Sequence, residues 1–299
     1  MIDIKIGTLI PGMSAETMIP QLNAVGFESY QLRFETDVVA LDFDEYARRI
    51  SAVLDGRAVN YAIYGNTLTD GDVRRGVETL IRNAPLLNCG AIGLFAGGNP
   101  DKTVPDTIPE WKAVFEPLCE MAEAYGVKLA LEGCGRGWNG GSHNLAYCPE
   151  AWDLVFDAVK SPALGLEWEP CHALEALADP IPQLRRYAPK VVHLHGKDGT
   201  VAWDVIRDYG INGIHPYMWN RTPGFGDTNW SDVFTILLQA GFSGSCDIEG
   251  YHDPVHYDDM EWTSQVRSLQ YLKDCRGGRE YWPGPTEYRG YQGTRRPVK

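Results

Sequence analysis

Long apolar runs are missing from this chain of 299 residues. No stretch approaches the roughly 20 apolar residues that a membrane-spanning helix needs. The opening residues 1–5 also lack the apolar region of a signal peptide. We therefore expect a cytoplasmic protein with no membrane partner. Basic residues are also fewer than acidic ones, 27 against 40, which gives a net charge of −13. Nucleic-acid binding needs a basic patch or stripe, so we expect no nucleic-acid partner.

Cysteine pairs and phosphate-binding loops are also absent from the sequence. The seven cysteines are odd in number, include no CxxC pair and are scattered along the chain, which favours reduced thiols over a disulfide framework. No glycine-rich phosphate loop occurs, and Gly97-Gly98 alone is a weak signal. A phosphorylated substrate is therefore not required. All seven histidines lie after residue 140, so any histidine chemistry belongs to the second half of the chain.

The sequence does contain a regular alternation of strand and helix patterns. Each predicted strand precedes a predicted helix; the strands are 4–9, 29–34, 58–64, 91–95, 127–132, 164–169, 191–198 and 245–249. Parallel strands need helical crossovers and are buried on both faces. Eight such pairs predict an α/β protein with a single (β/α)8 TIM barrel. An open doubly wound sheet is the alternative, and residues 198–228 are expected to form a long loop.

We expect the barrel to occupy residues 1–275 and an irregular extension to occupy residues 276–299. The extension carries six basic and two acidic residues together with four aromatic side chains, and its prolines and glycines exclude a helix. A disordered tail is one interpretation. Packing against the barrel or a partner subunit is favoured, because exposed aromatic side chains gain from burial.

The strand at 191–198 is the most informative one. Side chains alternate along a strand, so His193, His195 and Lys197 project to the same side. A hydrogen-bonded pair of core histidines, or an edge strand with one face in water, would explain this row without a function. Three other apolar runs, however, each end in a carboxylate, which favours a functional role for the row. These carboxylates are Glu132, Glu169 and Glu249.

In a parallel barrel these strand ends meet at one face, so Glu132, Glu169, His195 and Glu249 are expected to converge. Three carboxylates at that distance repel one another unless a cation holds them. Three oxygens and one imidazole favour a fairly hard divalent ion, Mn²⁺ first, with Mg²⁺, Co²⁺ or Zn²⁺ as alternatives. Helix capping and salt bridges are the competing explanation for these acids.

Further polar residues are candidates for catalysis or substrate binding. His143 lies in a glycine-rich loop after Glu132, and it is either a general acid or base or a solvated loop residue. His193 and Lys197 could orient substrate oxygens or stabilise an enolate. Arg33, Arg136 and Arg221 are further polar candidates, and Trp138, Trp168, Tyr217 and Trp219 could stack on a sugar or an aromatic group. Each of these can equally be structural.

Together these residues resemble the xylose isomerase-like barrels, which include sugar isomerases, epimerases, inosose dehydratases and abasic-site endonucleases. The resemblance covers residues 4–273 and rests on Glu132 and the runs 169–172, 193–198, 223–230 and 248–249. It implies metal ligands at Glu132, Glu169, His195 and Glu249, and a substrate-contacting histidine at His172. Many relatives have aspartate in place of Glu169, which leaves the metal open. The endonuclease branch is a poor match, because it uses more histidines and a basic surface.

Within this group the chain looks most like the large subunit of bacterial C-glycoside deglycosidases. The similarity lies in Glu132, the loop 140–143, the runs 193–198 and 221–226, and the basic aromatic tail. It implies a 3-oxo-glucoside substrate that loses a proton at C2 and its aglycone from C1. It also implies an acid–base role for His143, a small β-rich partner subunit and an oligomeric assembly. Trp138 and Arg221 are expected to bind the substrate with His172.

Two other functions stay open. A ketose or inositol-type isomerase or 3-epimerase would begin with the same proton removal beside a carbonyl, and would need no partner. A noncatalytic sugar-binding or scaffold subunit would hold a structural metal instead.

Overall fold

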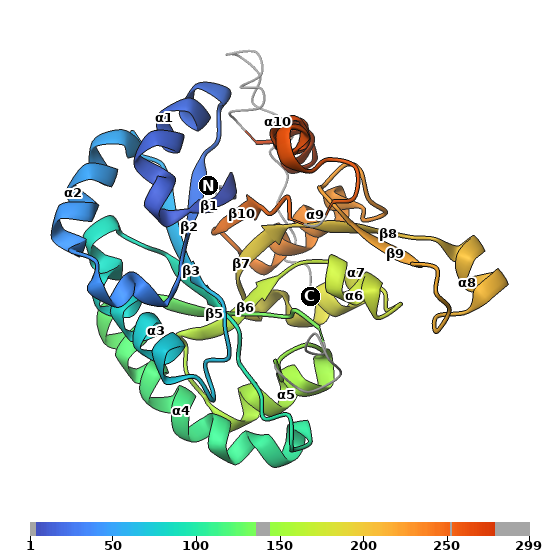
Figure 1. Cartoon of the computed structure of the whole chain (residues 1–299), viewed down its shortest axis with the longest axis horizontal. Coiled ribbons are helices and arrows are strands. Elements are labelled where there is room, and N and C mark those ends of the chain that lie inside the picture. The colour runs from blue at the N-terminus through green and yellow to red at the C-terminus, as the bar shows by residue number, and fades with distance from the viewer. Residues whose placement is uncertain (1–3, 136–143, 252, 279–299) are drawn as a thin grey trace, which may run out of the picture.

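Eight parallel strands form a closed barrel surrounded by helices (Figure 1). The computed structural model describes residues 4–135, 144–251 and 253–278. The barrel strands are β1 (Lys5–Pro11), β2 (Ser29–Phe34), β3 (Ala58–Ile63), β4 (Ala91–Leu94), β5 (Lys128–Glu132), β6 (Leu164–Trp168), β7 (Val191–Gly196) and β10 (Ser245–Ile248). Strand β1 pairs with both β2 and β10. The predicted barrel is therefore confirmed, and the open-sheet alternative is wrong.

Helices connect successive strands and cover the outside of the barrel. They are α1 (Ala15–Val25), α2 (Phe43–Leu54), α3 (Gly71–Asn83), α4 (Val104–Tyr125), α5 (Pro149–Ala158), α6 (Cys171–Glu175), α7 (Pro180–Tyr187), α9 (Trp230–Ala240) and α10 (Glu261–Arg276). Their ends follow local chemistry. The carboxylate of Asp70 accepts hydrogen bonds from the first backbone amides of α3, and α4 ends at Gly126 with a positive φ of 72°, a conformation that suits glycine.

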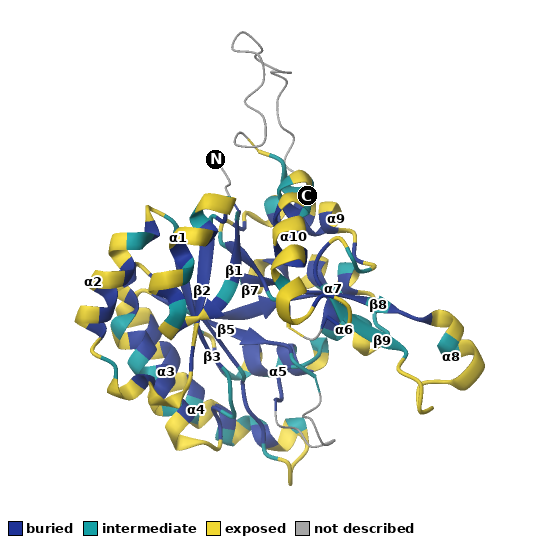
Figure 2. Cartoon of the chain, turned by 45° about the horizontal axis from the view of Figure 1, so that its top comes forward, coloured by how far each residue is buried: buried dark blue, intermediate teal, exposed yellow. Residues whose placement is uncertain are grey.

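The main apolar core lies between the strands and the helices, as the buried inner faces in Figure 2 illustrate. Large aromatic side chains fill this layer: Trp111 stacks on Phe115 with ring centroids 4.5 Å apart, and Trp230 is fully buried. The interior of the barrel is different. Barrels of this kind usually fill that space with branched apolar side chains, whereas here it contains buried polar groups: Ser29, Gln31, Asn60, Glu167, His193 and Asp247.

Residues 198–228 form an arm instead of the expected loop. Strands β8 (Asp198–Val201) and β9 (Met218–Arg221) pair antiparallel and carry the short helix α8 (Trp203–Tyr209) between them. Figures 1 and 2 show this arm projecting away from the barrel. The loop prediction was wrong because strands of four residues are too short to show an alternating pattern.

Helix α10 extends through Arg276, the first residue of the expected extension. Most of the predicted extension, residues 279–299, lies outside the described residues. Within the described part of the chain, no helix combines the length and the apolar character needed to cross a membrane.

An ion pair ties α10 to the bottom of the barrel. Arg276 donates to Glu28 Oε2 at 2.6 Å and to the backbone oxygen of Ile4 at 2.7 Å, and the backbone amide of Ile6 donates to the same carboxylate at 2.9 Å. Burial raises the pKa of Glu28, but the bonds from Arg276 and Ile6 more than offset it and leave the pKa below its ordinary value. The carboxylate therefore stabilises the fold mainly as an anion.

We expect Glu28→Gln to lower the free energy of unfolding by about 2 kcal/mol at neutral pH, because it leaves a buried guanidinium without its anion. Because the pKa of Glu28 is lower in the folded protein, its carboxylate stabilises the fold fully above the unfolded pKa of 4.5. This stabilisation is lost as pH falls through the folded pKa. The difference from wild type should therefore shrink in acid, as measured by urea unfolding. Glu16→Gln, in an exposed pair with Arg49, should change stability little. An equal loss in both variants would contradict this.

Candidate metal centre

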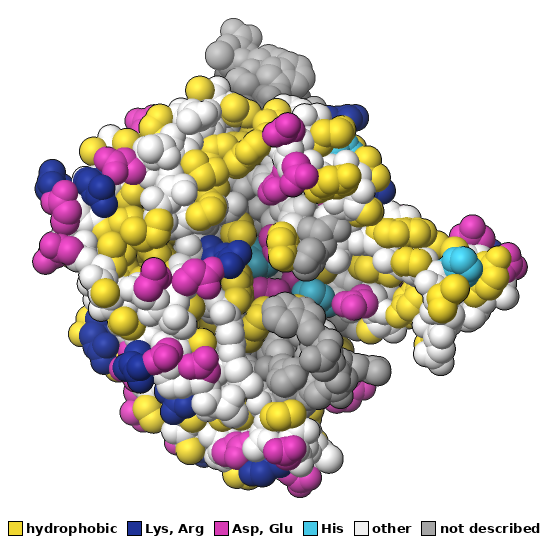
Figure 3. Space-filling model, viewed as in Figure 1, with side chains coloured by type: hydrophobic (Ala, Val, Ile, Leu, Met, Phe, Trp, Pro, Cys, Tyr) yellow, Lys and Arg dark blue, Asp and Glu magenta, His cyan; other side chains and the backbone are white. Residues whose placement is uncertain are grey.

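Four side chains predicted as metal ligands meet at the mouth of the barrel. Glu132 ends β5, Glu169 follows β6, His195 lies near the end of β7 and Glu249 follows β10. One ligand atom from each lies within 4.8 Å of the other three. The distances from His195 Nδ1 are 4.0 Å to Glu132 Oε2, 3.9 Å to Glu169 Oε2 and 3.4 Å to Glu249 Oε2. Figure 3 shows acidic and histidine side chains near the centre of this face.

The atoms that face one another in this cluster lack hydrogen bonds. Within the described residues, His195 Nδ1, Glu169 Oε2 and Glu249 Oε2 are buried and have no hydrogen-bond partner. Unpaired buried polar atoms are costly. Two carboxylate oxygens and an imidazole nitrogen that lie close together without partners therefore fit a divalent cation.

Two cationic side chains border the cluster. Lys197 Nζ lies 2.9 Å from Glu249 Oε1, and His172 Nε2 lies 2.6 Å from Glu169 Oε1. Burial alone would lower the pKa of both groups, but neighbouring negative charges, Glu249 for Lys197 and Glu169 among those for His172, raise both pKa values well above the ordinary range. Burial raises the pKa of Glu169, yet His172 and Lys197 hold it below its usual value. Two cations therefore face three carboxylates, which leaves room for further positive charge.

His193 lies one layer deeper than the mouth. It is fully buried, its Nδ1 lies 2.8 Å from Glu167 Oε1, and its Nε2 lies 2.8 Å from Asp247 Oδ2. Both ring nitrogens are thus engaged with carboxylates in the barrel interior. The alternation of side chains along the strand was predicted correctly, but it places His193 beneath His195 and not beside it, so direct contact with substrate is not supported.

Burial on its own would lower the pKa of His193, but the hydrogen bonds from its ring to Asp247 and Glu167 raise it to about 9. His193 is therefore an imidazolium at neutral pH, bridging two buried anions. A buried histidine held between two acids is a structural cation.

The other predicted site residues are placed differently. Arg221, the last residue of β9, donates from Nε to Asp253 Oδ2 at 3.1 Å. Arg33 pairs with Glu35 and is half exposed. Tyr217 donates to the backbone oxygen of Glu175 at 3.1 Å, and Trp219 lies in β9. His143, Trp138 and Arg136 lie outside the described residues.

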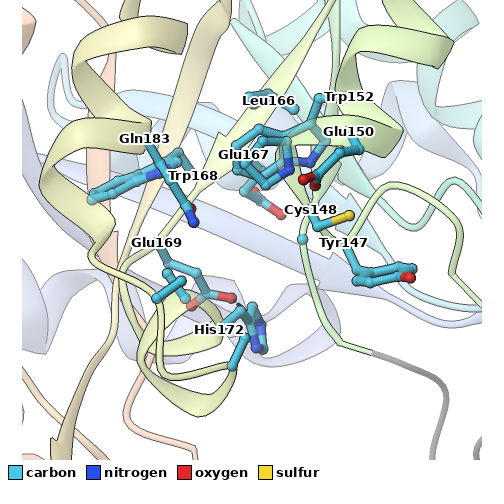
Figure 4. Close-up of a pocket in the computed structure, with 15 residues that line it drawn as sticks. Tyr147, Cys148, Glu150, Trp152, Leu166, Glu167, Trp168, Glu169, His172 and Gln183 are labelled. Carbon is cyan, nitrogen blue, oxygen red and sulfur yellow. Dashed lines mark ion pairs between the residues drawn. The ribbon is translucent and has the colours of Figure 1, made fainter.

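A cavity of about 220 Å³ adjoins the cluster. Figure 4 shows Glu169 and His172 on one side of it and the indole rings of Trp152 and Trp168 on the other. Glu150, Cys148 and Gln183 add polar groups to its wall. An aromatic cavity next to charged groups suits a ligand with one polar and one flat apolar part.

Several residues of the centre were missed from the sequence. Gln31 Oε1 lies 2.7 Å from His195 Nε2, and the hydroxyl of Tyr64 lies 3.2 Å from the same nitrogen and donates to Glu167 Oε2 at 2.9 Å. Asp247 also accepts from Asn60 at 3.1 Å. Glu167 and Asp247 each precede a predicted ligand by two residues, so strand alternation carries the signal for them. Gln31 and Tyr64 lie on distant strands with no such signal.

Comparison with known proteins identifies relatives of the whole barrel. A family profile described as xylose isomerase-like TIM barrel matches residues 19–275. The uncharacterized protein YfiH of Bacillus subtilis is 27% identical over 224 residues, which cover 62% of this chain and 68% of YfiH. Inosose dehydratase of Bacillus thuringiensis is 22% identical over 120 residues, 39% of this chain and 40% of that enzyme. The match thus spans less than half of the dehydratase.

Among solved structures, 3-keto-D-glucoside 4-epimerase YcjR of E. coli superimposes with a TM-score of 0.67 at 13% identity. The superposition covers 91% of this chain and 100% of YcjR. At this identity the likeness establishes the shared fold.

We expect His193→Leu to lower the free energy of unfolding of the metal-free protein by about 3–5 kcal/mol, because two buried carboxylates lose their shared cation. Because folding raises the pKa of His193 from 6.5 to about 9, the protonated ring stabilises the fold fully below pH 6.5. This stabilisation is lost as pH rises through about 9. The gap between wild type and variant should therefore narrow between about pH 6 and about pH 10 in urea unfolding. A gap of constant size would mean that the ring is neutral.

Proposed function

This chain belongs to the xylose isomerase-like TIM barrel family, and from that membership we propose a divalent-metal-dependent enzyme that removes a proton beside the carbonyl of a keto-sugar. The observation that carries the proposal is the cluster of Glu132, Glu169, His195 and Glu249, in which the facing atoms of Glu169, His195 and Glu249 are buried without hydrogen bonds. Three carboxylates and one imidazole favour Mn²⁺, with Mg²⁺, Co²⁺ or Zn²⁺ as alternatives. Bound there, the ion supplies Lewis-acid polarisation of a substrate carbonyl.

The chain's own residues divide the remaining work. His172 is an imidazolium with 12% of its side chain exposed, so it can donate a hydrogen bond to a substrate oxygen. Lys197 keeps its proton, which makes it a donor to negative charge and unsuited to accept the substrate's proton. The resemblance assigns the acid–base role to His143. Among the described residues, Glu132 and Glu249 are the groups at the mouth able to take a proton.

We propose that the reaction is an elimination on a 3-oxo-glucoside, as in C-glycoside deglycosidases. The C2–H bond breaks, C1 and C2 become doubly bonded, and the C1–aglycone bond breaks while the aglycone takes up a proton. Two relatives support the parts of this scheme. YcjR is named for a 3-keto-glucoside substrate, and inosose dehydratase is named for an elimination. The aromatic cavity beside Glu169 and His172 supports a flat aglycone.

Epimerisation is a second candidate, and the position of two carboxylates favours it. Glu132 and Glu249 approach from β5 and β10, which are separated around the barrel by β6 and β7. One acid on each side of a substrate could remove a proton from one face and return it to the other. In that case no bond to a leaving group would break.

The proposed deglycosidase also requires a small β-rich partner subunit. The arm supports a partner, because α8 has no buried residue and Trp203, Tyr209, Ile211 and Ile214 are at least half exposed. Exposed apolar surface of this kind typically marks a protein interface. Copurification of a second, smaller chain would support this assembly, and a chain that is active alone would contradict it.

The metal is tested first. We expect wild-type protein to bind one Mn²⁺ in calorimetry, and Glu169→Gln to weaken binding by more than the ~100-fold that loss of an outer hydrogen-bond partner costs. Saturating metal should also raise the unfolding free energy, by about 2.7 kcal/mol at a hundred times Kd. Glu175→Gln, an exposed neighbour of His172, is the matched control and should bind normally. Equal binding by all three proteins would refute the assigned ligands.

The reaction is tested in D₂O with Mn²⁺-loaded protein, the copurified subunit if one is found, free ketoses and 3-oxo-glucosides of phenolic aglycones. We expect proton NMR to show release of the aglycone, and Glu132→Gln and His143→Ala to abolish it. Deuterium at the carbon beside the carbonyl without aglycone release would exclude the elimination and leave an isomerase or epimerase. Bound metal with no exchange on any sugar would indicate a noncatalytic subunit.

A further inference from the structure

We propose that Glu167 is a positioning residue that determines which ring nitrogen of His195 faces the carboxylates at the barrel mouth. The inference rests on the proposed function only in taking that cluster as a metal site. It concerns the layer beneath the mouth, where Glu167 is 1% exposed.

The first step is that Glu167 can only accept hydrogen bonds. An ionised carboxylate has no hydrogen to give. Its Oε1 accepts from Gln31 Nε2, and its Oε2 accepts from the Tyr64 hydroxyl at 2.9 Å. Gln31 must therefore turn its amide nitrogen toward Glu167, and Tyr64 must use its one hydrogen there.

The second step is that both partners then offer only oxygen lone pairs to His195. Gln31 Oε1 lies 2.7 Å from His195 Nε2, and the Tyr64 oxygen lies 3.2 Å from it. Two acceptors at one ring nitrogen require that this nitrogen carries the hydrogen. The neutral ring then has its lone pair on Nδ1, which is the atom 3.4 Å from Glu249 Oε2. Glu167 Oε1 itself lies 3.4 Å from His195 Nε2, so Glu167 acts on the cluster directly as well as through Gln31 and Tyr64.

His193 and Gly93 hold Glu167 in place. His193 Nδ1 lies 2.8 Å from Glu167 Oε1, and His193 Nε2 lies 2.8 Å from Asp247 Oδ2. Space for the carboxylate comes from Gly93, where a Cβ would lie 2.4 Å from Glu167 Oε1. The charge and the shape of the interior therefore both hold this one orientation.

A second metal ion is the competing interpretation of the same atoms. Glu167, His193 and His195 also bring potential ligand atoms within 4.8 Å of one another. However, Glu167 Oε1, both nitrogens of His193 and His195 Nε2 already have hydrogen-bond partners. At the mouth, by contrast, Glu169 Oε2, Glu249 Oε2 and His195 Nδ1 have none. The lower group is therefore a hydrogen-bond network that supports the upper one.

The test compares Glu167→Gln with Asp247→Asn. Each variant removes one of the two carboxylates that flank His193, but the other hydrogen bonds of Asp247 go to Ser29 and Asn60. Glutamine at 167 replaces one carboxylate oxygen by an amide nitrogen. Gln31 and Tyr64 can then no longer both donate to this side chain. We expect Glu167→Gln to weaken Mn²⁺ binding about 10- to 100-fold in calorimetry, and Asp247→Asn to stay within about threefold of wild type.

Ring spectra give a readout that general destabilisation would not move. Two-bond ¹H–¹⁵N correlations of Mg²⁺-loaded protein should place the hydrogen on Nε2 of His195 in wild type and Asp247→Asn. Hydrogen on Nδ1 in wild type, or equal loss of Mn²⁺ affinity in both variants, would overturn the proposal. If Glu167→Gln does not fold, Gln31→Met and Tyr64→Phe each remove one oxygen facing Nε2. Unchanged affinity in both would also overturn it.

Failure of the proposed function would be recognised separately. If wild type binds no divalent ion, the metal-dependent function fails, and spectra of the metal-free protein at alkaline pH still decide the inference: hydrogen on Nε2 supports it and hydrogen on Nδ1 refutes it. If metal binds but no keto-sugar exchanges its proton, the reaction fails while the positioning role of Glu167 stands.

Discussion

The buried imidazolium of His193 is the interaction on which the rest of this barrel depends. It joins β6, β7 and β10 by bonding Glu167 and Asp247 at 2.8 Å each. Two carboxylates in that interior would repel each other without it. A barrel interior of branched apolar residues would avoid this electrostatic problem, and a buried ion pair is rarely more stable than an apolar replacement. The charged interior is therefore better explained by what it does for the layer above.

That upper layer follows from a simple repeat of two residues. Each of three strands directs two polar side chains inward, one at its end or just beyond it and one two residues earlier. The pairs are Glu167 and Glu169, His193 and His195, and Asp247 and Glu249. Strand alternation predicted the row on β7, and the strand ends predicted the four clustered side chains. The same rule places Glu167 and Asp247 in the lower layer. The acid that ends each run does not reveal them, because each lies two positions earlier, within a strand that is otherwise largely apolar.

Other parts of the centre could not be read from the sequence. Gln31 and Tyr64 reach His195 from β2 and from the residue after β3, on the far side of the closed barrel. Only closure brings them there, and no local pattern encodes it. The ion pair between Arg221 and Asp253 could not be predicted either, because the two residues are 32 positions apart in the sequence. The arm was mistaken for a loop because its stability comes from pairing β8 with β9 and not from periodicity. Local rules thus predict which side chains point inward, and tertiary contacts decide what they meet.

In the proposed function the cluster and its support serve one opening step, and the surroundings decide its outcome. Polarising a carbonyl and removing the adjacent proton gives an enolate whether the product is an epimer or an alkene. Elimination additionally needs room for the departing group and a proton donor beside it. The cavity bounded by Trp152 and Trp168 shares Glu169 and His172 with the cluster, so room and an imidazolium donor occur at the same edge. Epimerisation needs no space for a departing group, but it needs a second acid on the opposite face, which Glu249 could supply from across the mouth from Glu132. The cavity is thus the feature specific to elimination, and the pair of opposed carboxylates is the feature specific to epimerisation.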